Sequence, residues 1–267
     1  MATRREAPKS PNAFTELLRP KAQPKPLTEP ASSDLSRPGH HEAAMSKGAW
    51  RGALLDYIQH PERFPQSVLR VTDSTVLLRD LYPKATVHLL LLPRSPAFYE
   101  LHPHDAFQNP DFLAMMKREA ASGVQLAAAE LERQFSPYSA SSKARSDAMD
   151  AGVAWDDLPP GRDYLSAFQV GIHAHPSMAH LHVHIISRDM RSDKLKHRKH
   201  YNTFTTPFFI PLADFPLAPD DERRRRSFQN ANLTRDSVCW RCGTNFGNKL
   251  TALKKHLADE FELWRRE

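Results

Sequence analysis

Residues 180 to 186 alternate histidine with large apolar side chains. They read His180-Leu181-His182-Val183-His184-Ile185-Ile186. In a β-strand, side chains two positions apart lie on the same face of the sheet, roughly 6–7 Å apart. The pattern therefore predicts a strand with three histidines on one face and with Leu181, Val183 and Ile185 on the core face. Packing alone rarely places three imidazoles in one row.

Three kinds of site fit this row of histidines. Imidazoles are good ligands for zinc or copper, so a metal site is the first. A surface row without a role is the second. The third is a phosphate site, in which a neutral imidazole attacks phosphorus while flanking histidines and backbone N–H groups hold the oxygens. His173 and His175 lie just upstream and make the cluster denser.

The chain around this strand predicts an α+β domain. The first expected element is a helix that starts at Ser46, carries Trp50, Leu54, Tyr57 and Ile58, and ends at Pro61. Strands over 68–72, 75–80 and 87–92 follow it. A long helix opened by Asn109-Pro110 comes next, then a surface loop over 136–162 and strands over 164–171 and 181–187. Residues 214–226 predict a linker that runs into a basic helix. This order favours an antiparallel sheet covered by helices, with a small C-terminal module.

Composition sets the expected domain boundaries. Residues 1–45 are rich in proline and basic residues, which predicts a disordered tail, followed by a catalytic domain over 46–212 and a C-terminal region over 213–267. The two cysteines exclude a disulfide framework, and no apolar run suits a membrane span or a secretory signal. We therefore expect a chain that stays inside the cell. The formal net charge of +6 is compatible with a polyanionic partner.

The C-terminal region predicts a metal site. Cys239 and Cys242 form a Cys-x2-Cys pair, and His256 and Glu260 follow four residues apart on one face of an expected helix. Carboxylates bind zinc at about 2.0–2.2 Å, so all four side chains can serve one ion. Four protein ligands leave no open position for water, which predicts a structural zinc. The alternative is a reduced cysteine pair beside an ordinary helix.

The histidine pattern resembles the signature His-φ-His-φ-His-φ-φ, with φ apolar, of the HIT superfamily of nucleotide hydrolases and transferases. Further segments resemble the aprataxins of that superfamily, which are DNA 5′-adenylate hydrolases. These segments are Gly171–Met178, Ile186–Met190, Asp80–Ala85 with His88, and the stretch from Lys196 to Phe204. The resemblance runs from about Trp50 to the C-terminus, apart from 136–162. We expect the shorter, fungal form of aprataxin, because the chain leaves no room for the N-terminal phosphopeptide-binding domain of animal aprataxins.

The resemblance implies an active site. The middle histidine of the signature is the nucleophile in that superfamily, so His182 is implied to form a covalent intermediate with AMP. The residues implied to hold phosphate oxygens or to orient the nucleophile are His184, His180, His173, Ser177, Lys196 and His200. The adenosine pocket is implied to contain Asp80, Lys84, His88 and Leu90, although the apolar residues of this hairpin fit a plain core equally well. No catalytic metal is needed.

The implied partner is DNA that carries AMP on its 5′ end after abortive ligation, with AMP as the product. DNA contacts are expected at Trp50, Arg223, Arg224, Lys254 and Lys255. An exposed tryptophan would stack on the terminal base pair, but burial in the core fits equally well, and the basic side chains would contact phosphates. We expect a monomer in the nucleus, with the cytoplasm as a second compartment. Preference for RNA–DNA junctions stays open.

Two other functions also stay open. A HIT-type nucleoside phosphoramidase or dinucleoside polyphosphate hydrolase would share His182 but would need neither the finger nor the arginine cluster. A non-enzymatic nucleic-acid-binding protein would use the finger and leave the HIT domain inert. The intact row of histidines argues against the second.

Overall fold

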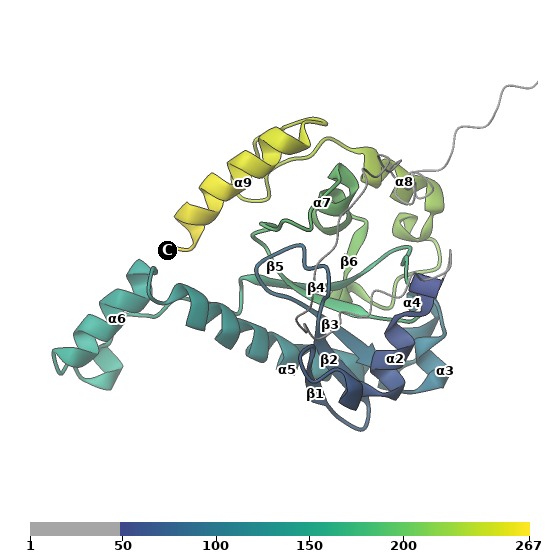
Figure 1. The fold of residues 1–267 in the computed structure, drawn as a ribbon, viewed down its shortest axis with the longest axis horizontal. Coiled ribbons are helices and arrows are strands. Elements are labelled where there is room, and N and C mark those ends of the chain that lie inside the picture. The colour runs from purple at the N-terminus through teal and green to yellow at the C-terminus, as the bar shows by residue number, and fades with distance from the viewer. Residues whose placement is uncertain (1–48) are drawn as a thin grey trace, which may run out of the picture. The chain divides into compact units, whose positions relative to one another are not determined.

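The computed structural model describes residues 49–267, in which one antiparallel sheet organises the chain (Figure 1). Its six strands are β1 (Val68–Val71), β2 (Thr75–Arg79), β3 (His88–Pro93), β4 (Phe168–His173), β5 (Val183–Ser187) and β6 (Phe209–Pro211). They pair in the order β1-β2-β3-β5-β4-β6, and every neighbouring pair is antiparallel. The predicted α+β class is confirmed. This order places β5, the strand of the histidine pattern, in the interior of the sheet.

Helices surround this sheet. They are α2 (Leu54–Gln59), α3 (Pro96–Tyr99), α4 (Pro103–Ala106), α5 (Pro110–Phe135), α6 (Ala140–Asp150), α7 (Arg198–Thr205), α8 (Arg226–Thr234) and α9 (Leu250–Trp264). The long helix α5 begins as the sequence predicts. The side chain of Asn109 accepts a hydrogen bond from the backbone N–H of Phe112, and Pro110 occupies the first helical position.

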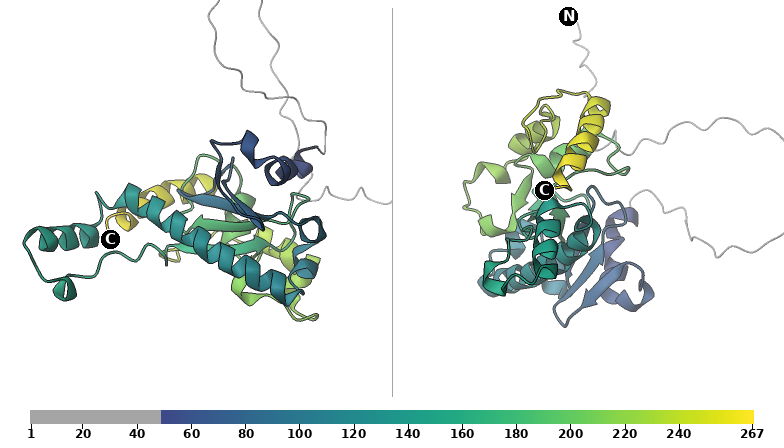
Figure 2. Two further views of the ribbon diagram at one scale, coloured as in Figure 1. Left: turned by 90° about the horizontal axis from the view of Figure 1, so that it is seen from below. Right: turned by 90° about the vertical axis from the view of Figure 1, so that its left-hand side faces the viewer.

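The helix α5 runs along one face of the sheet (Figure 2, left). Its buried stripe, which includes Leu113 and Met116, packs against Val183 and Ile185 of β5 in the main core cluster. A side chain at Gly123 would bring its Cβ to 2.5 Å from Cδ1 of Ile185, so the helix and the strand are in close contact. Burial of one such aliphatic side chain stabilises a fold by about 1.5–3 kcal/mol. This packing fixes the apolar face of β5 and turns its histidine to the opposite face.

The opposite face of the sheet is covered in two parts. At one end, Leu54 and Ile58 of α2 pack with apolar residues of β2 and β3. At the other end, Tyr201 and Phe204 of α7 pack with Ile186 of β5. Since His184 pairs with Leu90 across β5 and β3, it lies on this face, where α7 approaches the sheet.

The C-terminal finger packs into the same body as the sheet. Leu253 and Leu257 of α9 belong to one core cluster with Ile186, and Trp264 packs edge-on against Phe135 of α5 at 5.3 Å between ring centroids. The described residues, 49–267, belong to one compact unit. The catalytic region and the C-terminal region, divided at residue 213, therefore pack against each other. The boundary between two domains at this residue stays a prediction.

The expected loop over residues 136–162 was wrong where α6 forms. Ser139 caps this helix by accepting a hydrogen bond from the N–H of Ser142, and Lys143 pairs with Asp147 one turn later. Serine and aspartate suggested a loop, yet here they cap the helix and pair along it. No residue of α6 is buried, so the segment does lie at the surface.

Other element boundaries also differ from expectation. The strand β5 begins at Val183, so His180 and Leu181 precede it, and β4 begins at Phe168 rather than at residue 164. The predicted linker does run into a helix, α8, but this helix is not basic, because only Arg226 of the four arginines 223–226 lies in it. Trp50 lies in a 3-10 turn (Ala49–Gly52) ahead of α2. The expected helix cap at Ser46 and the tail over 1–45 lie outside the described residues.

Candidate active site

The backbone holds His182 as a neutral imidazole with a defined tautomer. The side chain is 6% exposed, and its Nδ1 lies 2.8 Å from the carbonyl oxygen of His180. A carbonyl oxygen only accepts hydrogen bonds, so Nδ1 carries the proton and Nε2 keeps its lone pair. Burial lowers the pKa of His182 below its ordinary value of 6.5. The ring therefore offers an uncharged nucleophilic nitrogen.

The tautomer of His184 follows from a chain of two hydrogen bonds. The N–H of Lys84 donates to Nδ1 of His88 at 3.2 Å, which places the proton of His88 on Nε2. That proton is donated to Nδ1 of His184 at 2.9 Å, so the proton of His184 lies on Nε2. Burial lowers the pKa of His88 to about 4 and the pKa of His184 well below 6.5. Asp80 lies 3.4 Å from Nδ1 of His88 and would form an ion pair only with a protonated ring.

His173 is half-buried and packs against the buried ring of His184. The two ring centroids are 4.5 Å apart, and Phe204 packs against both rings. Burial also lowers the pKa of His173 well below 6.5. Among the described residues, Nε2 of His173 and Nε2 of His184 are buried without a hydrogen-bond partner. A buried polar atom in this state costs about 1–3 kcal/mol, which favours a cluster that receives its partners from a ligand.

Basic groups lie beside this cluster. Burial lowers the pKa of Lys84, and burial together with the charge of Lys84 lowers the pKa of His200 to about 4. Nδ1 of His200 accepts a hydrogen bond from the N–H of Lys196 at 3.2 Å, which leaves Nε2–H as a donor. These residues come from the segment before β3 and from the start of α7, so the fold brings distant parts of the chain to one side of the histidines.

Three further predicted site residues, His180, Ser177 and Leu90, have other surroundings. The ring of His180 packs edge-on against Tyr99, and its carbonyl oxygen is the group that orients His182. Ser177 is half-buried in the turn between β4 and β5, and Leu90 is buried in the cluster that includes α2. Roles for Ser177 and Leu90 in binding stay predictions.

Sequence reasoning missed the carboxylate that anchors the end of β5. Asp189 is 1% exposed and accepts hydrogen bonds from the backbone and the side chain of Thr86 and from the hydroxyl of Ser187. Burial raises its pKa, while these hydrogen bonds act in the opposite direction. The contact joins residues 103 positions apart. It therefore holds β5 and the segment before β3 in the register that His88 and His184 need.

The four expected metal ligands lie together. One ligand atom from each of Cys239, Cys242, His256 and Glu260 lies within 4.8 Å of the others. Nε2 of His256 is 3.4 Å from Oε1 of Glu260, and two such ligands on a tetrahedral zinc would be about 3.3 Å apart. The donor set therefore fits a structural zinc. A second group, Asp80, His88 and His184, also lies within 4.8 Å, but its two histidines are hydrogen-bonded to each other.

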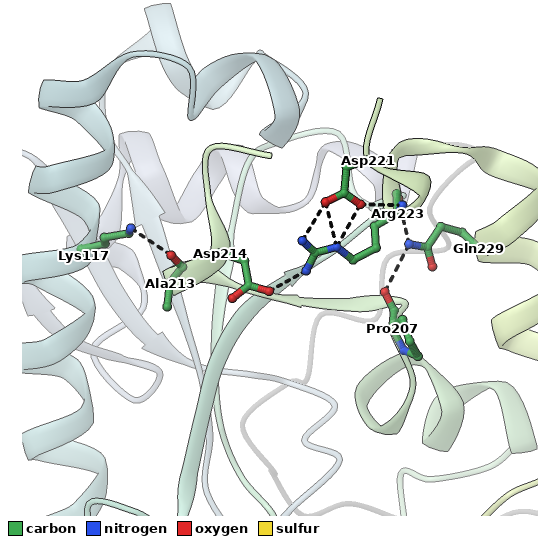
Figure 3. Close-up of polar contacts among 7 residues, drawn as sticks. All are labelled: Lys117, Pro207, Ala213, Asp214, Asp221, Arg223 and Gln229. Carbon is green, nitrogen blue, oxygen red and sulfur yellow. Dashed lines mark hydrogen bonds and ion pairs between the residues drawn. The ribbon is translucent and has the colours of Figure 1, made fainter. Parts of the chain in front are cut away.

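Arg223 is engaged within the protein (Figure 3). Its guanidinium donates to Asp221 at 2.8 and 3.0 Å and pairs with Asp214, and these contacts raise its pKa. Its carbonyl oxygen accepts a hydrogen bond from Gln229. Arg224 is half-buried, and its side chain has no hydrogen bond or ion pair with the residues that the structure describes. Of these two arginines, Arg224 has the freer side chain.

The other expected DNA contacts lie on two separate elements. Trp50 is half-buried in the first turn of the described chain. Lys255 is exposed and Lys254 is half-buried, both on α9 within the finger. Contact between these residues and DNA stays a prediction.

Comparison with known proteins agrees with this architecture. Residues 62–191 match the model of the HIT domain, and residues 205–263 match the model of the C2HE / C2H2 / C2HC zinc-binding finger. An aprataxin-like protein of Saccharomyces cerevisiae is 37% identical over 217 residues, which are 80% of this chain and 96% of the yeast protein. One of Schizosaccharomyces pombe is 32% identical over 218 residues, which are 82% of this chain and 84% of that protein.

A solved structure is similar over the same region. The crystal structure of the aprataxin ortholog Hnt3 in complex with DNA has a TM-score of 0.61 and 29% sequence identity, and the match covers 80% of this chain and 96% of that one. The resemblance inferred from the sequence is confirmed. The chain belongs to the aprataxin-like proteins, with a HIT domain followed by a zinc-binding finger.

Proposed function

We propose that the chain removes AMP from 5′-adenylated DNA ends through a covalent intermediate on His182. Membership of the aprataxin-like proteins supports a HIT-domain hydrolase of DNA repair. The observation that carries the proposal is the 2.8 Å hydrogen bond from Nδ1 of His182 to the carbonyl oxygen of His180. It leaves Nε2 free to attack, and it supports the positive charge that the ring gains on attack.

The reaction has two steps. First, Nε2 of His182 forms a bond to the phosphorus of AMP, while the bond from that phosphorus to the bridging oxygen of the pyrophosphate breaks. The electron pair leaves with the DNA 5′-phosphate, which is a weak base and needs little protonation. Water then attacks the same phosphorus, the phosphorus–nitrogen bond breaks, and AMP leaves with the oxygen from water while its proton passes to solvent. Division of one hydrolysis into two steps lowers each barrier.

Groups around His182 would hold the phosphate oxygens. Nε2–H of His184 is the best supported donor, because it is buried and lacks a partner among the described residues. We assign the same task to His173, Ser177, Lys196 and His200. Removal of one such donor typically costs about 10²–10³ in rate. Because these groups can offset the developing charge, the proposal includes no catalytic metal.

The remaining residues would bind the rest of the substrate. Asp80, Lys84, His88 and Leu90 would line the adenosine pocket, and Trp50 would stack on the terminal base pair. We assign the phosphate contacts to the basic side chains of Arg224, Lys254 and Lys255. The Hnt3 structure with DNA supports DNA as the partner. The proposal includes adenylated nicks and ends, and RNA–DNA junctions as a further substrate. We propose that the chain acts as a monomer in the nucleus and that its zinc is structural.

A competition between two substrates tests this function. Turnover of a 5′-adenylated nicked duplex is measured against turnover of a small adenosine phosphoramidate, with the native chain, with His182→Ala and with His60→Ala as a control. The side chain of His60 is 42% exposed, and it is hydrogen-bonded to none of the clustered histidines among the described residues. We expect faster turnover of the DNA substrate, loss of both activities in His182→Ala and no change in His60→Ala. Preference for the small substrate by orders of magnitude would instead indicate a nucleoside phosphoramidase.

A further inference from the structure

The carboxylate of Glu260 is divided between two neighbours. Its Oε1 lies 3.4 Å from Nε2 of His256, which in turn lies 3.1 Å from Sγ of Cys242. Its other oxygen, Oε2, accepts a hydrogen bond from Nη1 of Arg241 at 2.5 Å. One oxygen therefore belongs to the ligand group and the other is held outside it.

Arg241 is itself held in place. Its Nη2 donates to Oε1 of Glu267 at 2.5 Å, so the two ends of the guanidinium bind two carboxylates. Arg241 lies between the two cysteine ligands in the sequence Cys239-Trp240-Arg241-Cys242, and its side chain is 29% exposed. The planar fork of arginine suits this double contact, which a lysine ammonium cannot reproduce in the same geometry.

The charge of the ligand set explains why a cation is needed there. Zinc ligands bind in their deprotonated forms, so two thiolates neutralise Zn²⁺ and a fourth, neutral histidine would leave the site uncharged. Glu260 in that position adds one negative charge. Glu260 is 9% exposed and Cys239 is 2% exposed, whereas Cys242 is exposed, so water screens only part of this excess charge. Arg241 supplies the compensating positive charge at hydrogen-bond distance.

We propose that Arg241 is a positioning residue for the zinc site. It holds Oε2 of Glu260, which leaves Oε1 on the side of His256, and it would neutralise the charge that a carboxylate ligand adds to a Cys2His set. This inference rests on the structural zinc proposed above. Groups that orient a metal ligand from outside typically contribute about 10–100-fold to metal affinity.

The test is a cycle of substitutions in the full chain. The zinc dissociation constant is measured by competition with a chromophoric chelator for the native chain, Arg241→Gln, Arg241→Lys, Glu260→His and the double variant of Arg241→Gln with Glu260→His. We expect Arg241→Gln to weaken zinc binding by about 10–100-fold, and Arg241→Lys by less because it keeps the charge. With histidine at position 260, the ligand set is neutral and Arg241→Gln should have little further effect.

Arg265→Gln is the matched control. Arg265 directly follows α9 and pairs with Glu262 of that helix, which is not a ligand, and the side chain of Arg265 is 25% exposed. The zinc affinity of the Arg265→Gln chain should equal that of the native chain. The same loss from Arg241→Gln in both backgrounds would show a general effect on folding and would overturn the proposal.

Further results distinguish a failure of the proposed role of Arg241 from a failure of the proposed structural zinc. If Glu260→His does not fold, equal zinc affinity in the native, Arg241→Lys and Arg241→Gln chains overturns the role of Arg241 without that variant. A visible spectrum of the Co²⁺-loaded chains gives a second readout, since loss of the Glu260 ligand in Arg241→Gln would change the tetrahedral bands. If the native chain binds no zinc at all, the structural zinc itself is wrong.

Discussion

Nε2 of His88 on β3 lies 2.9 Å from Nδ1 of His184 on β5, and this contact decides which nitrogen of His184 carries the proton. The first prediction concerns this contact. His88→Leu removes the donor and frees His184 to adopt the other tautomer, so kcat should fall by about 10²-fold. His88→Gln should retain more activity, because its amide N–H can donate to the same nitrogen. Single-turnover kinetics on a 5′-adenylated nick measure the activity of both variants. Full activity in His88→Leu would contradict the role of His88 in fixing the tautomer of His184.

The second prediction separates two neighbouring arginines. Arg223 binds Asp214 and Asp221, so Arg223→Gln should lower thermal stability and change DNA binding little. Arg224→Gln should leave stability unchanged and weaken DNA binding. If Arg224 contacts one phosphate, the slope of log affinity against log salt should become shallower by about 0.9. Thermal melting and fluorescence anisotropy at several salt concentrations test the pair, and an unchanged slope in Arg224→Gln would refute the contact.

The third prediction concerns the pH dependence of stability. His88 has a pKa of about 4 in the folded chain and 6.5 as the ordinary value, so the unfolded chain takes up a proton first as the pH falls. This contribution to stability is complete above about pH 6.5 and is lost as the pH falls to about 4, with a size of about 3 kcal/mol. Urea unfolding across this range should show a steeper loss in the native chain than in His88→Gln. Equal pH dependence in the two chains would contradict the buried neutral state.

The alternation of histidines predicted the correct face of β5 but only part of the cluster. Val183 and Ile185 are fully buried against α5, as expected. His180 is not in the strand, because β5 begins three residues later, at Val183. Periodicity gives the face of a residue but does not give the residue at which a strand begins, since pairing with β3 and β4 decides that. The carbonyl oxygen of His180 accepts the hydrogen bond from His182, and a pattern of side chains cannot predict such a backbone contact.

Contacts between distant segments were the least predictable part. Cys239, Cys242, His256 and Glu260 form a local group whose spacing is visible in the sequence, and the structure gathers them. The hydrogen bond from His88 to His184 joins residues 96 positions apart. Arg223 was expected at DNA because it belongs to a run of arginines, yet two aspartates engage it. Composition counts charges, whereas only tertiary structure determines which charges already have partners.

One measurement tests the central claim most directly. The native chain is mixed with a 5′-adenylated nicked duplex, quenched within a single turnover, digested and mapped by mass spectrometry. The neutral Nε2 of His182 predicts an AMP adduct on His182 and on no other residue, and no adduct in His182→Ala. An AMP adduct on any other residue, or full deadenylation of the nick by His182→Ala, would contradict the account.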